Sequence, residues 1–131
     1  MDGSDASVDA VRRALQQAQL TGSELEVLTS WNVPNQFAEL VADEIDWDAR
    51  ARAILEDTLA TDHIEKDLQV TRTARPGHPA QVLMDASKTA DLLVVGSRGH
   101  DGFTGMLLGS VSTHVAAHAH CPVVVVRHRT D

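Results

Sequence analysis

Residues 91–110, DLLVVGSRGHDGFTGMLLGS, decide the fold of this chain. The stretch begins with an apolar run over residues 91–95 and passes at Gly96 into a glycine-rich segment. At Gly109-Ser110 it enters a run with helical spacing. A continuous apolar run of this length, bounded by glycines and followed by a helix, predicts a buried strand of a parallel sheet.

The same alternation of helix and strand extends over the rest of the chain. Helices are predicted over residues 4–20, 46–61 and 110–119 and from Pro79 onward, and strands over residues 25–31, 68–74, 91–95 and 123–126. Apolar strands that alternate with helices indicate a parallel sheet covered on both faces. We therefore predict one α/β domain over residues 1–131, with a single doubly wound, Rossmann-like parallel sheet.

The composition argues against several classes of partner and compartment. The formal net charge of −8 disfavours nucleic-acid binding, because that binding needs a basic surface to displace counterions. No apolar run approaches the ~20 residues that a membrane span needs. Cys121 is the single cysteine and cannot form an intrachain disulfide, which favours a reducing compartment and a buried, structural thiol. We expect a cytoplasmic protein without nucleic-acid or membrane partners.

Three glycines give the 91–110 stretch its chemistry. Gly96 ends a strand without a side chain, so a ligand can approach the backbone there. Gly99 permits a positive φ, which turns successive N–H groups into an anion-binding nest. Gly109-Ser110 lies where the last helix presents its free N–H groups, and Ser110 can cap the helix or donate to a phosphate oxygen. Two such concavities facing one crevice suit a polyphosphate, although the spacing matches neither a P-loop nor a dinucleotide fingerprint.

The spacing G-x2-G-x9-G-[S/T] resembles the signature of the ATP-binding class of universal stress proteins. Four further segments resemble the same family: Asp2-Gly3-Ser4, Leu28–Trp31, Gly77–Ala80 and Cys121–Arg127. The resemblance implies an adenine nucleotide α-hydrolase-like fold and an ATP-binding module for stress response or regulation. It also implies a homodimer through the last strand, Val123–Val126, and Mg²⁺ or Mn²⁺ on the phosphates.

The resemblance assigns the adenosine end of the ligand to residues early in the chain and at the end of the fourth strand. Asp2 would meet the adenine or the ribose. Ser30 occupies a position that lines the adenine pocket. Val95 and Gly96 would pass beneath the ribose and the phosphates.

The resemblance places the phosphates at the glycine-rich loop and at the start of the last helix. Arg98 and Gly99 would flank the phosphates. Gly109, Ser110 and Val111 would hold the terminal phosphates from the helix end. No catalytic residue and no protein-bound metal site is implied.

The chain departs from the family pattern at its beginning. The family has an apolar strand before its V-D-G-S turn, in the middle of the sheet, whereas this sequence starts at Met1-Asp2-Gly3-Ser4. We expect Met1 to stand where the family has valine. The strands at 25–31 and 91–95 are then expected to lack their shared partner, which leaves backbone groups to be satisfied in another way.

Two other functions remain open from the sequence. An interaction domain of the same fold need not bind nucleotide at all. Slow ATP hydrolysis needs a group that orients water, and only His100, Asp101 and Ser110 are candidates. The histidines of the last helix, His114 and His118, are interpreted as solvated rather than as metal ligands, because no cysteine or carboxylate completes a set.

Overall fold

The computed structural model describes residues 4–31, 46–61, 70–97 and 109–127. The elements in chain order are α1 (Asp5–Thr21), β1 (Leu25–Trp31), α2 (Trp47–Thr61), β2 (Val70–Pro76), α3 (Pro79–Ser87), β3 (Leu93–Gly96), α4 (Ser110–His118) and β4 (Val123–Val126). The α/β class and the alternation of helix and strand are as predicted. None of the helices in the described ranges is long and apolar enough to cross a membrane.

The described strands form two parallel pairs instead of the single sheet that the sequence predicts. β1 pairs with β2, from Leu25 opposite Val70 to Trp31 opposite Pro76. β3 pairs with β4, from Leu93 opposite Val123 onward. Within the described residues, no ladder joins β1 to β3. This agrees with the expectation that these two strands lack a shared partner.

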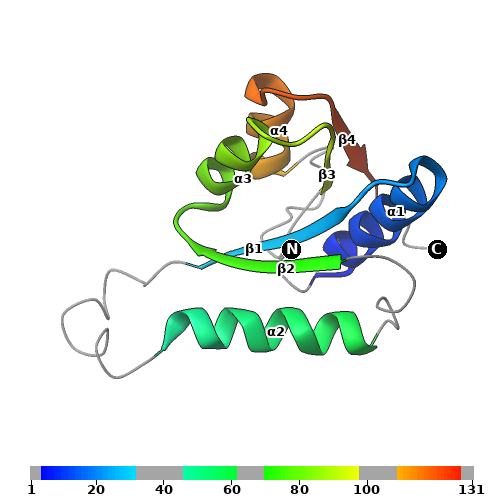
Figure 1. The fold of residues 1–131 in the computed structure, drawn as a ribbon. Helices are drawn as coiled ribbons and strands as arrows, with labels where there is room; N and C mark the ends of the chain where they lie inside the picture. Colours follow the sequence, from blue (N-terminus) through cyan, green and yellow to red (C-terminus); the bar gives the residue numbers. More distant parts are fainter. Residues whose placement is uncertain (1–3, 32–45, 62–69, 98–108, 128–131) are drawn as a thin grey trace.

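The helices are divided between the two pairs of strands. α2 packs along β1 and β2, and Figure 1 shows it on the opposite side of that pair from α3 and α4. α3 and α4 pack against each other, and Figure 1 shows them side by side. α1 packs mainly against β3 and also contacts β4 and β1, and so bridges the two pairs.

The sequence of α1 explains both of its ends. Ser4 is the N-cap, and its hydroxyl oxygen accepts from the Ser7 N–H at 3.2 Å. Gly22 closes the helix in the left-handed conformation, with φ 67°, which glycine adopts without steric cost. Ala6 and Ala10 are small, buried residues on the inward face, and they let α1 approach the neighbouring strand closely.

Two apolar clusters form the core, one for each pair of strands. The first joins α1, α2 and β1 through four buried residues: Val11, Val27, Leu55 and Leu59. The second joins β3 and α4 through Leu93, Val95 and Val115, and Cys121 packs against its margin. Both clusters are aliphatic, as expected for a chain with no tyrosine and few other aromatic residues.

A polar contact fixes the carboxyl end of β1 to the start of α2. The Trp31 indole N–H donates to one Asp48 oxygen at 3.0 Å, and Arg52 Nε donates to the other at 2.8 Å. These bonds, the one from Arg52 first, hold the pKa of Asp48 below its ordinary value. The contact accounts for an acidic side chain in the first turn of α2, where the helix dipole also favours it.

The strand predicted over 68–74 extends further toward the C-terminus in the structure. β2 runs from Val70 to Pro76, while residues 68 and 69 lie outside the described ranges. Proline ends the strand without loss of pairing, because the next N–H, that of Gly77, continues the ladder by donating to the Trp31 carbonyl at 2.8 Å. The strand therefore ends two residues later than the apolar pattern predicts, at Pro76 rather than Ala74.

Candidate functional site

The carboxyl end of β3 and the start of α4 are joined by hydrogen bonds. The Ser97 N–H donates to the Val126 carbonyl at 2.8 Å and so continues the ladder past the end of β3. The Gly109 N–H donates to the Ser97 carbonyl, and the Ser112 hydroxyl donates to the Gly96 carbonyl. Gly96 and Gly109, two of the three glycines of the sequence pattern, therefore lie at one strand-to-helix junction.

At this junction α4 begins without a side-chain cap. Gly109 is the N-cap residue, with φ −72° and ψ 165°, and makes no side-chain cap hydrogen bond. Ser110 is the first helical residue and is exposed, so the capping role considered for Ser110 falls to a residue with no side chain. The first N–H groups of a helix have no partner within it, and its dipole favours an anion beside them.

The absent side chain of Gly96 serves packing rather than an open approach to the backbone. A Cβ built at Gly96 would lie 2.8 Å from the Ala6 carbonyl oxygen and 3.2 Å from the Ala6 Cβ. The first turn of α1 already occupies this space. This corrects the expectation that a bare Gly96 leaves room for a ligand at that point.

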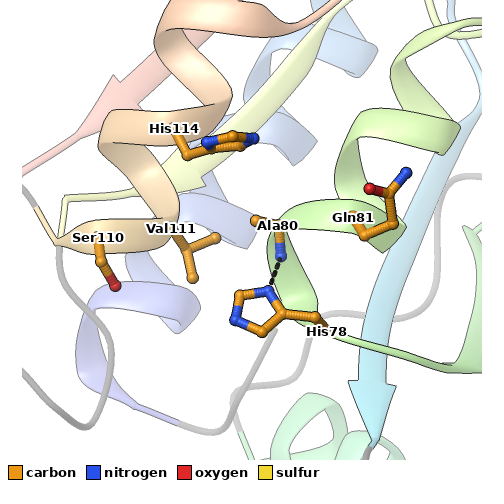
Figure 2. Close-up of a pocket in the computed structure, with 6 residues that line it drawn as sticks. All are labelled: His78, Ala80, Gln81, Ser110, Val111 and His114. Carbon is orange, nitrogen blue, oxygen red and sulfur yellow. Dashed lines mark hydrogen bonds between the residues drawn. The ribbon is translucent and has the colours of Figure 1, made fainter.

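A pocket of about 410 Å³ opens between the first turns of α3 and α4 (Figure 2). Its lining residues are His78, Ala80, Gln81, Ser110, Val111 and His114. None of the six is a carboxylate, whereas four carry side-chain hydrogen-bonding groups. In Figure 2, His114 lies one turn beyond Ser110 along α4, on the side that faces α3. A donor-bearing pocket without carboxylates suits an anionic or polar ligand.

The α3 side of the pocket is shaped by His78. His78 is the N-cap of α3, and its Nδ1 accepts from the Ala80 N–H at 3.2 Å, the bond drawn in Figure 2. Pro79 follows at the first helical position, where a missing N–H costs nothing. Because Nδ1 accepts, the proton of the neutral ring is on Nε2, and His78 presents a donor beyond the helix.

The structure brings together part of the predicted site. Ser110 and Val111 line the pocket, and Gly109 directly precedes them as the cap of α4. Gly96 lies at the junction beneath, connected through Ser112. Val95 is only 8% exposed within the second core cluster, so its side chain supports the junction from inside.

The other predicted residues are not gathered at this junction. Ser30 is half-buried in β1, opposite Arg75 of β2, and thus belongs to the other pair of strands. Asp2, Arg98 and Gly99 lie outside the described residues, as does the segment that links Gly99 to Gly109.

Sequence reasoning missed four residues that line the pocket: His78, Ala80, Gln81 and His114. A signal for two of them was available. His78 immediately precedes the proline that opens α3, and His114 lies four residues after Ser110, so both are placed near a helix start. Only the packing of α3 on α4 brings them to one pocket, and no pattern along the chain predicts that contact.

The remaining candidate groups are the two histidines of α4 and the single cysteine. The rings of His114 and His118 lie 4.9 Å apart at their centroids, and in the described part of the chain no three potential metal ligands gather. Cys121 forms no disulfide. Burial, and to a lesser extent the nearby Asp91 charge, raise the pKa of the Cys121 thiol, which keeps it protonated and unreactive.

Curated relatives resemble the chain over nearly its whole length. A universal stress protein of Mycolicibacterium smegmatis is 39% identical over 130 residues, which are 98% of this chain and 44% of the relative. Universal stress protein Rv2623 of Mycobacterium tuberculosis is 37% identical over 131 residues, covering 97% of this chain and 43% of the relative. The chain spans less than half the length of these curated relatives.

Solved structures share the fold, and a family profile covers the chain. The universal stress protein UspA from Lactobacillus plantarum has a TM-score of 0.80 at 23% identity, with 97% of this chain and 93% of that chain covered. A universal stress protein in complex with cAMP has a TM-score of 0.75 at 27% identity, with 99% and 94% covered. The sequence profile of the Universal stress protein family matches residues 1–127, so the chain belongs to this family.

Proposed function

We propose that this chain binds an adenine nucleotide, with ATP as the favoured ligand, and acts as a regulatory module rather than as an enzyme with a defined reaction. The observation that carries the proposal is the start of α4. There Gly109 leaves the first N–H groups without a side-chain cap, and Ser110 and Val111 open directly onto a pocket without carboxylates.

The phosphates of the ligand are assigned to this helix start. Backbone N–H groups at a helix N-terminus bind phosphate without any basic side chain, which suits a protein of net charge −8. In the proposal Ser110 donates to a terminal phosphate oxygen and Arg98 and Gly99 flank the chain of phosphates. Mg²⁺ or Mn²⁺ enters with the ligand on its phosphate oxygens, because none of the pocket's lining residues offers a carboxylate.

The adenosine is assigned to the strand ends. Asp2 and Ser30 take the adenine and ribose, while Val95 and Gly96 support the end of β3 from inside, against α4 and α1. The adenine class is supported by the relative solved with cAMP, which is 27% identical to this chain. That relative also makes cAMP the competitor to test against ATP, since both ligands carry the same adenosine group.

The first test is thermal unfolding of the chain with and without millimolar MgATP. A ligand present at 100 times its Kd stabilises a fold by about 2.7 kcal/mol, a clearly measurable rise in melting temperature. We expect a cooperative transition that rises with MgATP and rises less with equal concentrations of MgGTP. A cooperative transition that ignores ATP, ADP, AMP and cAMP would favour the interaction-domain alternative.

A homodimer through β4 is proposed as the assembly of this module. β4 pairs only with β3 among the described strands, and Val124 on it is 36% exposed. An apolar edge strand invites pairing with a second copy, and a lysine there blocks such pairing. We expect Val124→Lys to halve the mass measured by light scattering, while Ile54→Lys, at an exposed position on α2, leaves it unchanged. Equal masses for both variants and the wild type would contradict this dimer.

A further inference from the structure

We propose that His78 and His114 are specificity-determining residues that hold the last phosphate of the ligand and make the preference for a triphosphate increase as the pH falls. The inference rests on the proposed function and assigns two residues to it that the glycine pattern does not contain. The two histidines have different roles: His78 is a donor in a fixed tautomer, and His114 is the group that takes up a proton.

The pocket itself supports an anionic occupant. It lies beside Ser110, so a chain of phosphates bound at the start of α4 is continued directly into it. Ser110 and the two imidazoles carry N–H or O–H groups, and none of the lining residues supplies a carboxylate. A ligand with one phosphate does not extend past the helix start, whereas a triphosphate does.

His78 is held in place by its own helix. Its Nδ1 accepts from the Ala80 N–H at 3.2 Å, which fixes the ring orientation and leaves Nε2–H as the outward group. His78 therefore presents a hydrogen-bond donor to the pocket that it lines.

His114 has no such constraint on its imidazole. It is exposed on α4, lines the pocket, and its ring contacts that of His118 at a centroid distance of 4.9 Å. The elements packed against α4 are α3 and β4. α3 carries Asp85, whose carboxylate lies 3.7 Å from the ammonium group of the C-cap residue Lys88, and β4 consists of four valines without a charge.

With these neighbours, the phosphate of a bound ligand would be the main negative charge next to His114 in the pocket. Asp85 is paired with Lys88 and also accepts from Gln81 at 3.1 Å, and His118 carries either no charge or a like charge. A phosphate next to an imidazole favours the imidazolium and forms a charge-assisted hydrogen bond with it. Ligand binding thus takes up a proton, so affinity rises as the pH falls through the range in which histidine titrates.

The test compares MgATP and AMP binding by calorimetry at pH 6 and pH 8 in the intact chain. Four proteins are needed: the wild type, His114→Gln, His120→Gln as a matched exposed histidine just beyond the same helix and outside the pocket, and His78→Asn. Asparagine is a good N-cap residue and so keeps α3 capped while removing Nε2–H. Comparison with the wild type at each pH removes the titration of the ligand itself.

We expect His114→Gln to weaken MgATP binding about tenfold at pH 6 and only slightly at pH 8, the size of one charge-assisted hydrogen bond. His78→Asn should weaken MgATP binding several-fold at both pH values, and His120→Gln should match the wild type. AMP affinity should be the same in all four proteins. If the wild type binds MgATP but His114→Gln binds it equally at pH 6, the inference fails and the proposed function stands. A wild type that binds no adenine nucleotide overturns both.

Discussion

Replacing Gly109 by valine is expected to abolish ATP binding while the fold remains intact. Gly109 is the N-cap of α4, with φ −72° and ψ 165°, a conformation that valine adopts without strain. Its branched side chain would stand at the helix end, over the N–H groups that the proposal gives to the phosphates. We expect MgATP affinity in calorimetry to fall at least about 100-fold, because a phosphate that cannot reach these groups loses several charge-assisted hydrogen bonds.

A second substitution at the same position separates access from helix capping. Valine is a poor N-cap, but relative to glycine this costs about 1 kcal/mol or less, so the melting temperature without ligand should change by only a few degrees. Gly109→Ser places a good cap at the helix start with a much smaller side chain, and should retain more ATP affinity than Gly109→Val. ATP binding by Gly109→Val as tight as that of the wild type would show that the phosphates lie elsewhere.

The elements of this fold follow from local sequence signals. Helix α1 carries its own boundaries in Ser4 and Gly22, and α3 carries its start in His78-Pro79. β1 and β4 have the bounds that their apolar runs predict. These features depend on interactions between residues a few positions apart, which is why a single sequence is enough to predict them.

The arrangement of the strands needs more than local signals. Apolar strands that alternate with helices predict a parallel sheet, but this pattern does not say which strands are neighbours. The described residues form two pairs of strands rather than one sheet. The family resemblance supplied the expectation that β1 and β3 lack a common partner. Which elements cover the edges of the two strand pairs depends on how the whole chain packs, as the close contact of α1 with β3 shows.

The sequence pattern pointed to the backbone part of the candidate site. It did not point to the side chains that the packing of α3 on α4 brings there. The glycine spacing indicated a strand-to-helix junction, and the structure places Gly96 and Gly109 at one such junction. His78 and His114 each lie near a helix start in the sequence, but they meet only through the contact of α3 with α4. Gly96 belongs to the glycine pattern, but the structure explains its missing side chain by the close packing of α1.

We expect Gly96→Val to destabilise the folded chain by about 3 kcal/mol or more, at the upper end of the cost of overpacking a core. The added Cβ would lie 2.8 Å from the carbonyl oxygen and 3.0 Å from the carbonyl carbon of Ala6, so it meets backbone rather than a movable side chain. α1 would have to shift away from β3, the strand against which it mainly packs. Thermal unfolding should show a melting temperature lowered by about 10 °C.

Two comparisons identify the cause of this loss. Ala6→Gly in the Gly96→Val background removes only the contact with the Ala6 Cβ at 3.2 Å and should restore little, because the carbonyl group stays in place. Gly22→Ala has open space around its Cβ but a φ of 67°, so it should cost only about 1 kcal/mol through backbone strain. Full rescue by Ala6→Gly would contradict the backbone clash, and unchanged stability of Gly96→Val would mean that α1 does not lie on Gly96. Because Gly96 then acts through α1, a loss of ATP binding in Gly96→Val reports the position of this helix, whereas the same loss in Gly109→Val reports the phosphate site.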